Sequence, residues 1–171
     1  MKKEMSRRSF LRMGTTAAMG MAVAPSMMMG QSKKKKKAAP QPLDRKLKIL
    51  GVGIGGRGAS VLRGLETEEI IGLCDVDWKY AAHIFERYPN AKRYNDYRVM
   101  YAELLEEADA VVVATADHTH AIIAAEAIAA GKHVYVEKPL THTVYESRLL
   151  TKLAAKHKVA TQMGNQGASS K

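Results

Sequence analysis

The segment LKILGVGIGGRG, residues 47–58, constrains the fold more than any other part of the chain. A short apolar run leads directly into glycines spaced as G-x-G-x-x-G, and apolar positions at helical spacing follow as far as residue 66. A bare glycine motif could be only a flexible loop. A glycine loop that follows a strand and opens a helix is instead the fingerprint of a dinucleotide-binding turn. The segment therefore predicts the first strand, loop and helix of a parallel βαβ sheet.

The rest of the chain alternates short apolar runs with segments of helical periodicity. The run ADAVVVAT has no polar alternation, which is typical of a strand buried on both faces of a parallel sheet. With the first unit, the pattern makes six strands and five helices, and it predicts an α/β fold over residues 44–171. This fold is a doubly wound parallel sheet of the Rossmann type with helices on both faces. The further strands are predicted at 69–77, 91–96, 108–115, 132–138 and 159–164, and the further helices at 77–89, 97–107, 120–131 and 144–158.

The glycine loop and the end of the second strand carry the first candidate cofactor contacts. Asp75 follows the second strand, where a carboxylate can accept hydrogen bonds from the adenosine ribose and repel a 2′-phosphate. This favours NAD over NADP, although the nearby Lys79 leaves the preference open. Asp77 could act only as a helix N-cap. The loop contributes Gly53, Ile54, Gly55, Gly56, Arg57 and Gly58 as candidate cofactor-binding residues.

Polar residues also follow the fourth strand, in TADHTHA. Ligands of parallel sheets bind at the carboxyl ends of the strands, so this loop is expected to lie over the nicotinamide half of the cofactor. Thr115 or Asp117 could instead cap the following helix. His118 and His120 are not joined by a third ligand at suitable spacing, so no metal site is predicted.

The fifth strand ends in HVYVEKPLTH, with Glu137 and Lys138 stopped at once by Pro139. A lysine at this edge of the sheet can hydrogen-bond a substrate hydroxyl and assist proton transfer. The alternative is that Glu137 and Lys138 form only a surface ion pair. Asn165 and Gln166, in MGNQG after the sixth strand, could reach the nicotinamide or the substrate.

The formal net charge of +10 belongs mostly to the N-terminus. Residues 1–37 hold ten Lys and Arg and one Glu, whereas the remainder holds seventeen basic and sixteen acidic residues. The folded part is therefore almost neutral, which argues against a nucleic-acid-binding face. The single cysteine, Cys74, excludes an internal disulfide and is expected to be buried.

The N-terminal sequence SRRSFLR, residues 6–12, is similar to a twin-arginine export signal. Residues 1–30 combine this basic stretch with a moderately apolar one, as signal segments do. Residues 31–43 contain five consecutive lysines and then prolines, which predicts a linker. The protein is expected to use the twin-arginine export machinery. It would then be exported, either periplasmic or attached to the membrane through an uncleaved signal segment.

The motifs GIGGRG, CDVD, ATADHTH, GKHVYVEKPLTH and MGNQG, in that order, resemble the N-terminal domain of the Gfo/Idh/MocA oxidoreductases, in particular their exported branch. The resemblance covers residues 47–170, EKP is its most specific element, and Ala116 stands where the family commonly has Pro. It implies that Lys138 contacts both substrate and nicotinamide and is catalytic, with Glu137 supporting it. It also implies that Thr115, Asp117 and His120 line the nicotinamide ribose side.

Members of this family transfer a hydride between a sugar or cyclitol hydroxyl carbon and NAD(P), and some use NAD transiently to cleave glycosides. The resemblance implies an NAD-dependent oxidoreductase acting on a carbohydrate. Family members follow this domain with an α/β substrate domain that usually carries a catalytic histidine. Because the sequence ends at Lys171, the expectation is a fragment that lacks this C-terminal domain. The alternatives are a non-catalytic NAD-binding module, an NAD-dependent glycosidase when full length, or a structural protein on a dinucleotide-type fold.

Overall fold

The computed structural model describes residues 44–168, so the predicted signal segment 1–30 and linker 31–43 lie outside the described residues. Six parallel strands form one sheet in the order β3-β2-β1-β4-β5-β6. This confirms the predicted doubly wound sheet, including its minor third strand. The strands are β1 (Lys48–Val52), β2 (Glu69–Cys74), β3 (Lys92–Tyr94), β4 (Ala110–Val113), β5 (His133–Glu137) and β6 (Thr161–Gly164).

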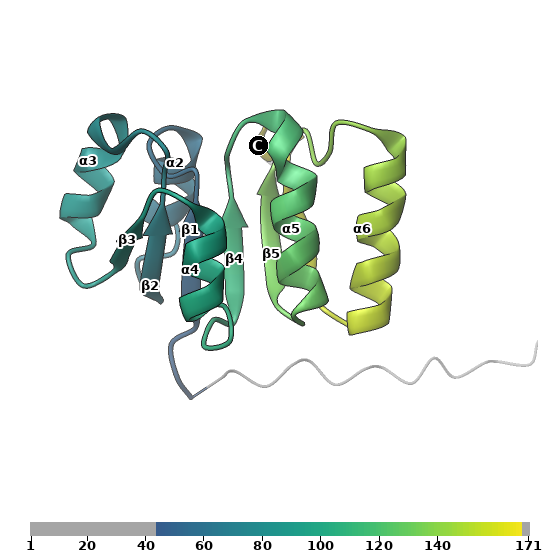
Figure 1. The fold of residues 1–171 in the computed structure, drawn as a ribbon, viewed down its shortest axis with the longest axis horizontal. Helices are drawn as coiled ribbons and strands as arrows, with labels where there is room; N and C mark the ends of the chain where they lie inside the picture. Colours follow the sequence, from purple (N-terminus) through teal and green to yellow (C-terminus); the bar gives the residue numbers. More distant parts are fainter. Residues whose placement is uncertain (1–43, 169–171) are drawn as a thin grey trace, which may run out of the picture. The chain divides into compact units, whose positions relative to one another are not determined.

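Helices cover both faces of this sheet, and each face has its own hydrophobic core. One core joins α4, α5 and α6 to the sheet through residues such as Met100, Ile123 and Leu150. The other joins α2 and α3 through residues such as Leu62 and Phe85. Figure 1 shows α4, α5 and α6 in front of the sheet and α2 behind it. The helices are α2 (Arg57–Arg63), α3 (Trp78–Arg87), α4 (Tyr97–Leu104), α5 (His120–Ala129) and α6 (Val144–His157), with short 3-10 turns η1 (Asp117–Thr119) and η2 (Gln166–Ala168).

The strand order reverses at β1, which lies between β2 and β4. Just past the end of β1, the N–H of Gly53 donates to the carbonyl of Cys74 on one side, at 2.8 Å. The N–H of Ala114 donates to the carbonyl of Val52 on the other side, at 2.9 Å. Such a switch point is where open α/β sheets bind their ligands, because the connections leave in opposite directions and open a crevice.

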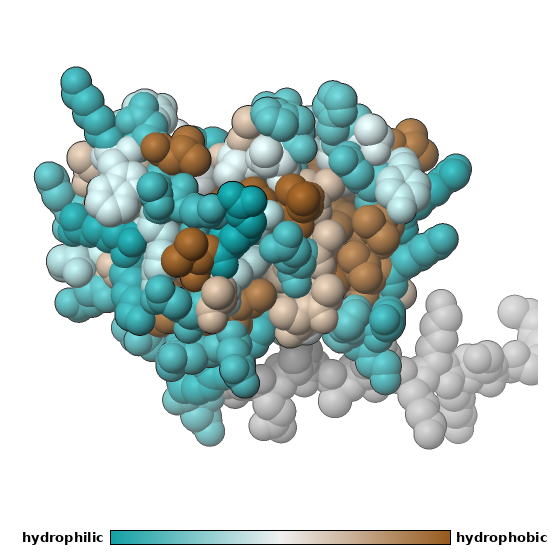
Figure 2. All heavy atoms as spheres, in the orientation of Figure 1, coloured by the Kyte–Doolittle hydropathy of each residue, from teal (hydrophilic) through white to brown (hydrophobic). Residues whose placement is uncertain are grey.

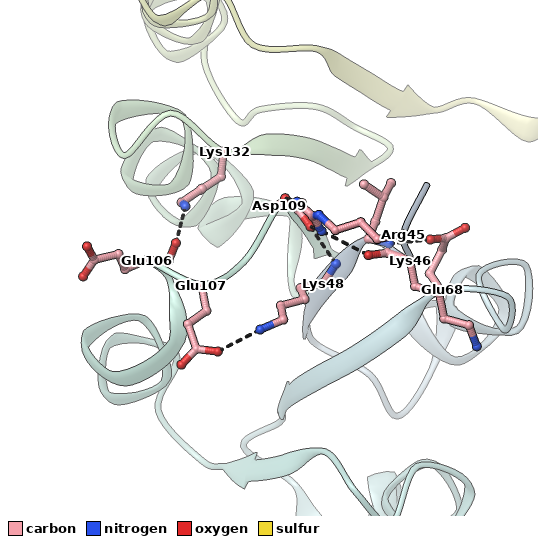
Figure 3. Close-up of polar contacts among 9 residues, drawn as sticks. Arg45, Lys46, Lys48, Glu68, Glu106, Glu107, Asp109 and Lys132 are labelled. Atoms are coloured by element: carbon pink, nitrogen blue, oxygen red, sulfur yellow. Dashed lines mark hydrogen bonds and ion pairs between the residues drawn. The ribbon is translucent and has the colours of Figure 1, made fainter. Parts of the chain in front are cut away.

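The amino ends of the strands are held by charged side chains (Figure 3). Arg45 donates to both carboxylate oxygens of Asp109, at 2.6 and 2.7 Å, and the backbone N–H of Lys48 donates to the same carboxylate at 2.8 Å. The Lys48 ammonium also pairs with Glu107, at 3.2 Å. This network ties the start of β1 to the loop before β4, at the end of the sheet opposite the crevice.

Apolar residues on the face that α4, α5 and α6 form are interspersed with hydrophilic ones, and the broadest apolar area lies over α5 and α6 (Figure 2). The exposed large apolar side chains include Val99, Ile122, Val144 and Tyr145. Between residues 44 and 168, no helix has the length and hydropathy needed to cross a membrane.

Candidate functional site

A cleft of about 700 Å³ opens at the carboxyl ends of β1, β2 and β4. It lies at the switch point of the sheet, where the fold predicts a ligand. Its walls include several predicted residues and others that the sequence did not indicate. The residues that line it include Gly53, Gly56, Cys74, Asp75, Tyr80, Arg98, Thr115 and Ile122.

The glycine loop forms the floor of this cleft, and its glycines are needed for close approach. Gly53 has a φ of +76°, and a Cβ on it would lie 2.6 Å from the backbone N of Thr115. A Cβ on Gly58 would overlap the carbonyl oxygen of Gly53. The loop therefore has the tight turn and the close helix–strand packing that a dinucleotide fingerprint requires.

Asp75 lies at the end of β2 and holds the glycine loop in place. Its Oδ2 accepts from the backbone N–H groups of Ile54 and Gly55, both at 2.8 Å, and its Oδ1 accepts from the N–H of Asp77 at 3.0 Å. Asp77 in turn accepts from the N–H of Tyr80 and caps α3, which confirms the capping interpretation. Asp75 thus supplies a carboxylate to the cleft from the position predicted for the ribose contact.

In the loop after β4, neither of the two residues considered as helix caps has that role. α5 begins at His120 with Thr119 at its N-cap position, after the η1 turn, so the idea that Thr115 or Asp117 caps this helix was wrong. Thr115 lines the cleft and accepts a hydrogen bond from the hydroxyl of Thr119 at 2.7 Å. Asp117 is exposed in η1. The η1 turn takes up the residues that would otherwise have capped α5.

His120, which the resemblance implied to line the nicotinamide ribose side, lies inside the protein. Only 1% of its surface is exposed. Its Nδ1 lies 2.7 Å from the carbonyl oxygen of Pro139, and its Nε2 lies 3.1 Å from that of Thr115. The ring therefore bridges the loop after β4 and the turn after β5.

Glu137 is the second buried polar residue of the described core, with 4% exposure. Its carboxylate accepts from Arg57 Nε at 3.1 Å, from Gln166 Nε2 at 2.5 Å and from the Tyr135 hydroxyl at 3.3 Å. Its Oε2 also accepts from the backbone N–H of Lys138, at 3.2 Å. Burial raises the pKa of Glu137, but these hydrogen bonds, led by that from Arg57, outweigh burial and leave the pKa below its usual value. A buried, ionised carboxylate is stable here because several donors replace its hydration.

The interpretation of Glu137 and Lys138 as a surface ion pair was therefore wrong. Glu137 forms its ion pair with Arg57, and Lys138 gives it only a backbone hydrogen bond. The side chain of Lys138 is exposed at the carboxyl end of β5, and the peptide bond to Pro139 is cis. Asn165 is exposed after β6, whereas Gln166 turns toward Glu137 and Tyr135.

Sequence reasoning missed part of the cleft wall. Arg98, held by both carboxylate oxygens of Asp96, comes from the start of α4, far from the glycine loop in sequence. The ring of Tyr80 packs against the loop, where a Cβ on Gly55 would lie 2.5 Å from it. The nearness of Tyr80 to Asp75 in sequence could have indicated that Tyr80 lines the cleft. No feature of the sequence indicated the same for Arg98. Among residues 44–168, no group of three or more His, Cys, Asp or Glu is placed to hold a metal ion.

These residues fit a bound dinucleotide, because a glycine floor and a strand-end carboxylate share one cleft at the switch point. The family described as "Oxidoreductase family, NAD-binding Rossmann fold" (Gfo/Idh/MocA) matches residues 46–165, which is more than half of the chain. The chain belongs to the Gfo/Idh/MocA oxidoreductase family. Its described part is the NAD-binding Rossmann domain of that family, as its motifs predicted.

Individual relatives are similar to this domain only. Inositol 2-dehydrogenase of Salmonella typhimurium (strain LT2) is 33% identical over an alignment of 97 residues that covers 54% of this chain and 28% of the relative. A glycosyl hydrolase family 109 protein of Shewanella sp. (strain MR-4) is 30% identical over an alignment of 135 residues that covers 73% of this chain and 29% of the relative. The solved structure of the WlbA dehydrogenase from Bordetella pertussis, in complex with NADH and UDP-GlcNAcA, aligns with a TM-score of 0.63 and 27% identity, over 75% of this chain and 38% of WlbA. The chain thus spans less than a third of these two curated relatives.

Proposed function

We propose that the protein is an NAD-dependent oxidoreductase that transfers a hydride at a hydroxyl-bearing carbon of a sugar or cyclitol. The observation that carries this proposal is the position of Lys138. Its side chain is exposed at the carboxyl end of β5, the strand next to β4, whose end forms a wall of the cleft. The named activities of the inositol dehydrogenase and WlbA relatives support a polyhydroxylated substrate.

In this proposal the residues of the chain bind the dinucleotide, orient the substrate and assist the removal of its proton. The glycine loop and Asp75 hold the dinucleotide, and the Asp75 carboxylate favours a free ribose 2′-hydroxyl, hence NAD over NADP. Bound NAD supplies the hydride acceptor. The Nζ of Lys138 hydrogen-bonds the reacting hydroxyl of the substrate and assists removal of its proton. Thr115, which lines the same cleft, would contact the nicotinamide half of the cofactor.

Two measurements test the proposal. Saturating NAD should raise the melting temperature of the full chain, because a ligand that binds the native state stabilises it. Lys138→Ala should leave that shift in melting temperature in place. In an assay with a panel of cyclitols and sugars, the same change should abolish NAD reduction. A melting temperature that does not respond to NAD, or turnover that survives Lys138→Ala, would contradict it.

A glycosidase that uses NAD transiently is the second candidate. The family 109 glycosyl hydrolase relative aligns with 73% of this chain, a larger share than the inositol dehydrogenase does. Release of nitrophenol from nitrophenyl glycosides, with no net NADH formed, would distinguish this activity from a dehydrogenase.

Export by the twin-arginine route is part of the proposal and rests on residues 6–12. That route moves folded proteins, so the cofactor would travel already bound. A double Arg7→Lys and Arg8→Lys variant should stay in the cytoplasm, as judged by cell fractionation. Exported protein that purifies without any NAD would contradict the idea of a cofactor carried across the membrane.

A further inference from the structure

We infer that Arg57 and His120 are positioning residues that hold the backbone of Lys138 from its two sides. Lys138 lies between Glu137, whose carboxylate is bound by Arg57, and Pro139, whose carbonyl contacts His120. This inference deepens the proposed function and rests on it, because Lys138 is the group that would meet the substrate.

The first anchor is the Glu137 carboxylate. Its side chain is 5% exposed, so its charge depends on protein donors rather than on water. Arg57 is the first residue of α2 and belongs to the glycine motif, whereas Gln166 lies in η2 beyond β6. Arg57, Gln166 and the Tyr135 hydroxyl all donate to Oε1, and the other oxygen, Oε2, accepts from the backbone N–H of Lys138. Arg57 therefore acts on Lys138 through Glu137.

The second anchor is the ring of His120. It reaches the carbonyl of Pro139 with one nitrogen and the carbonyl of Thr115 with the other. Because the ring is almost fully buried, close packing leaves it few other positions. The residue after Lys138 is thereby tied to Thr115, a wall of the cleft.

Both anchors connect Lys138 to residues that shape the cofactor cleft. Arg57 follows Gly56 of the cleft floor, and Thr115 lines the cleft directly. Within the Glu-Lys-Pro turn, the Lys138 side chain is exposed while the Glu137 carboxylate and the Pro139 carbonyl are held. The backbone of the lysine is thus fixed relative to the cleft, and its side chain is left to extend toward a substrate. Small displacements of a reacting group can cost large factors in rate, so such anchoring matters for catalysis.

The test follows Lys138 itself and needs no substrate. In the full chain with ¹³C-methylated lysines, the Lys138 resonance is assigned from its loss in Lys138→Arg. Arg57→Met removes the donor to Glu137 and should shift or broaden this resonance, and Arg57→Lys should restore it in part. Arg63→Met, an exposed change on the same helix, is the matched control and should leave the resonance unchanged.

A double-mutant cycle separates positioning from general damage. If Arg57 acts through Glu137, then Arg57→Met should add little to the change in the resonance that Glu137→Gln already causes. Additive effects of the two changes would overturn the assignment of Arg57. For the buried ring, His120→Gln keeps an amide that can donate to one carbonyl. His120→Phe keeps a planar ring but no group that can form a hydrogen bond. The inference expects a smaller disturbance of the Lys138 resonance in His120→Gln than in His120→Phe, and equal disturbance would overturn the assignment of His120.

The failure of the inference can be told from that of the proposed function. NADH binding is measured on the same samples from the emission of the bound nicotinamide. A wild-type chain that does not bind NADH contradicts the proposed function, while the Lys138 resonance without cofactor still decides the positioning role. If the chain binds NADH but the Lys138 resonance is unchanged in both Arg57→Met and His120→Phe, then only the positioning role is refuted.

Discussion

Gly58 on the first turn of α2 approaches Gly53 so closely that a Cβ on Gly58 would overlap the Gly53 carbonyl oxygen. Because that oxygen belongs to the backbone, it cannot move aside as the end of a side chain could. Gly58→Ala should therefore push α2 away from β1 and disturb the loop between them. We expect a melting temperature lower by several degrees and NAD affinity lower by about tenfold or more, since tenfold corresponds to only about 1.4 kcal/mol. Thermal unfolding and calorimetric titration measure the two effects.

Gly64→Ala is the control, because Gly64 ends the same helix with a φ of −72°. A Cβ there would lie 3.3 Å from the carbonyl oxygen of Val61, a tight but tolerable contact. The change should leave stability and NAD affinity nearly as they are. If Gly58→Ala behaved like Gly64→Ala, close packing of α2 on β1 would not be a requirement of the site.

Asp75 has two effects that substitutions can separate. Asp75→Asn keeps an oxygen for the N–H groups of Ile54 and Gly55 but removes the charge that repels a 2′-phosphate. It should narrow the preference for NAD over NADP by about tenfold, the size of one ordinary charge interaction of about 1–2 kcal/mol. Asp75→Ala should also loosen the loop and weaken the binding of both cofactors. Calorimetric titration with NAD and with NADP gives the ratio of the two affinities for each variant.

Asp77→Ala serves as the control for Asp75. Asp77 lies two residues further on and caps α3, so its loss should cost about 1 kcal/mol of stability. The ratio of NAD to NADP affinity should stay the same. A ratio that changed equally in the Asp75 and Asp77 variants would mean that general negative charge, and not the position of Asp75, sets the preference.

The sequence predicted the elements of the fold well because apolar periodicity and glycine positions are local signals. All six strands lie inside the predicted segments. Contacts between distant segments were not predictable in the same way. Arg57 and Glu137 are separated by 80 positions, and no local pattern indicates that a guanidinium in the glycine loop will meet the fifth strand. The helix α5 begins at His120 as predicted, but no local pattern indicates that this ring will meet the carbonyl of Pro139, 19 positions away, and so the burial of His120 was missed.

The thiol of Cys74 should be unreactive in the folded protein. Cys74 is 3% exposed, and burial, with smaller contributions from Asp75 and Asp96, raises the pKa of its thiol to about 12. The reactive thiolate is therefore scarce at neutral pH. A disulfide reagent at pH 7 should label the native chain very slowly and label it fully in denaturant, and NAD should slow native labelling further because Cys74 lines the cleft. Rapid labelling of the native chain would contradict this environment.

The Arg45–Asp109 pair should make stability depend on pH in acid. The hydrogen bond from Arg45, opposed by burial and helped by the Lys48 N–H, lowers the pKa of Asp109 to about 2, from an ordinary value of about 4. A carboxylate with a lowered pKa contributes its stability above the unfolded pKa and loses it as the pH falls through the folded one. Asp109→Asn should therefore cost about 1–2 kcal/mol at pH 6, after allowance for partial exposure, with the cost shrinking between pH 4 and about 2. Urea unfolding from pH 6 to pH 3 measures this. Glu107→Gln removes an exposed partner of Lys48 and should cost much less at every pH, so an equal and pH-independent loss in both variants would rule out the special role of Asp109.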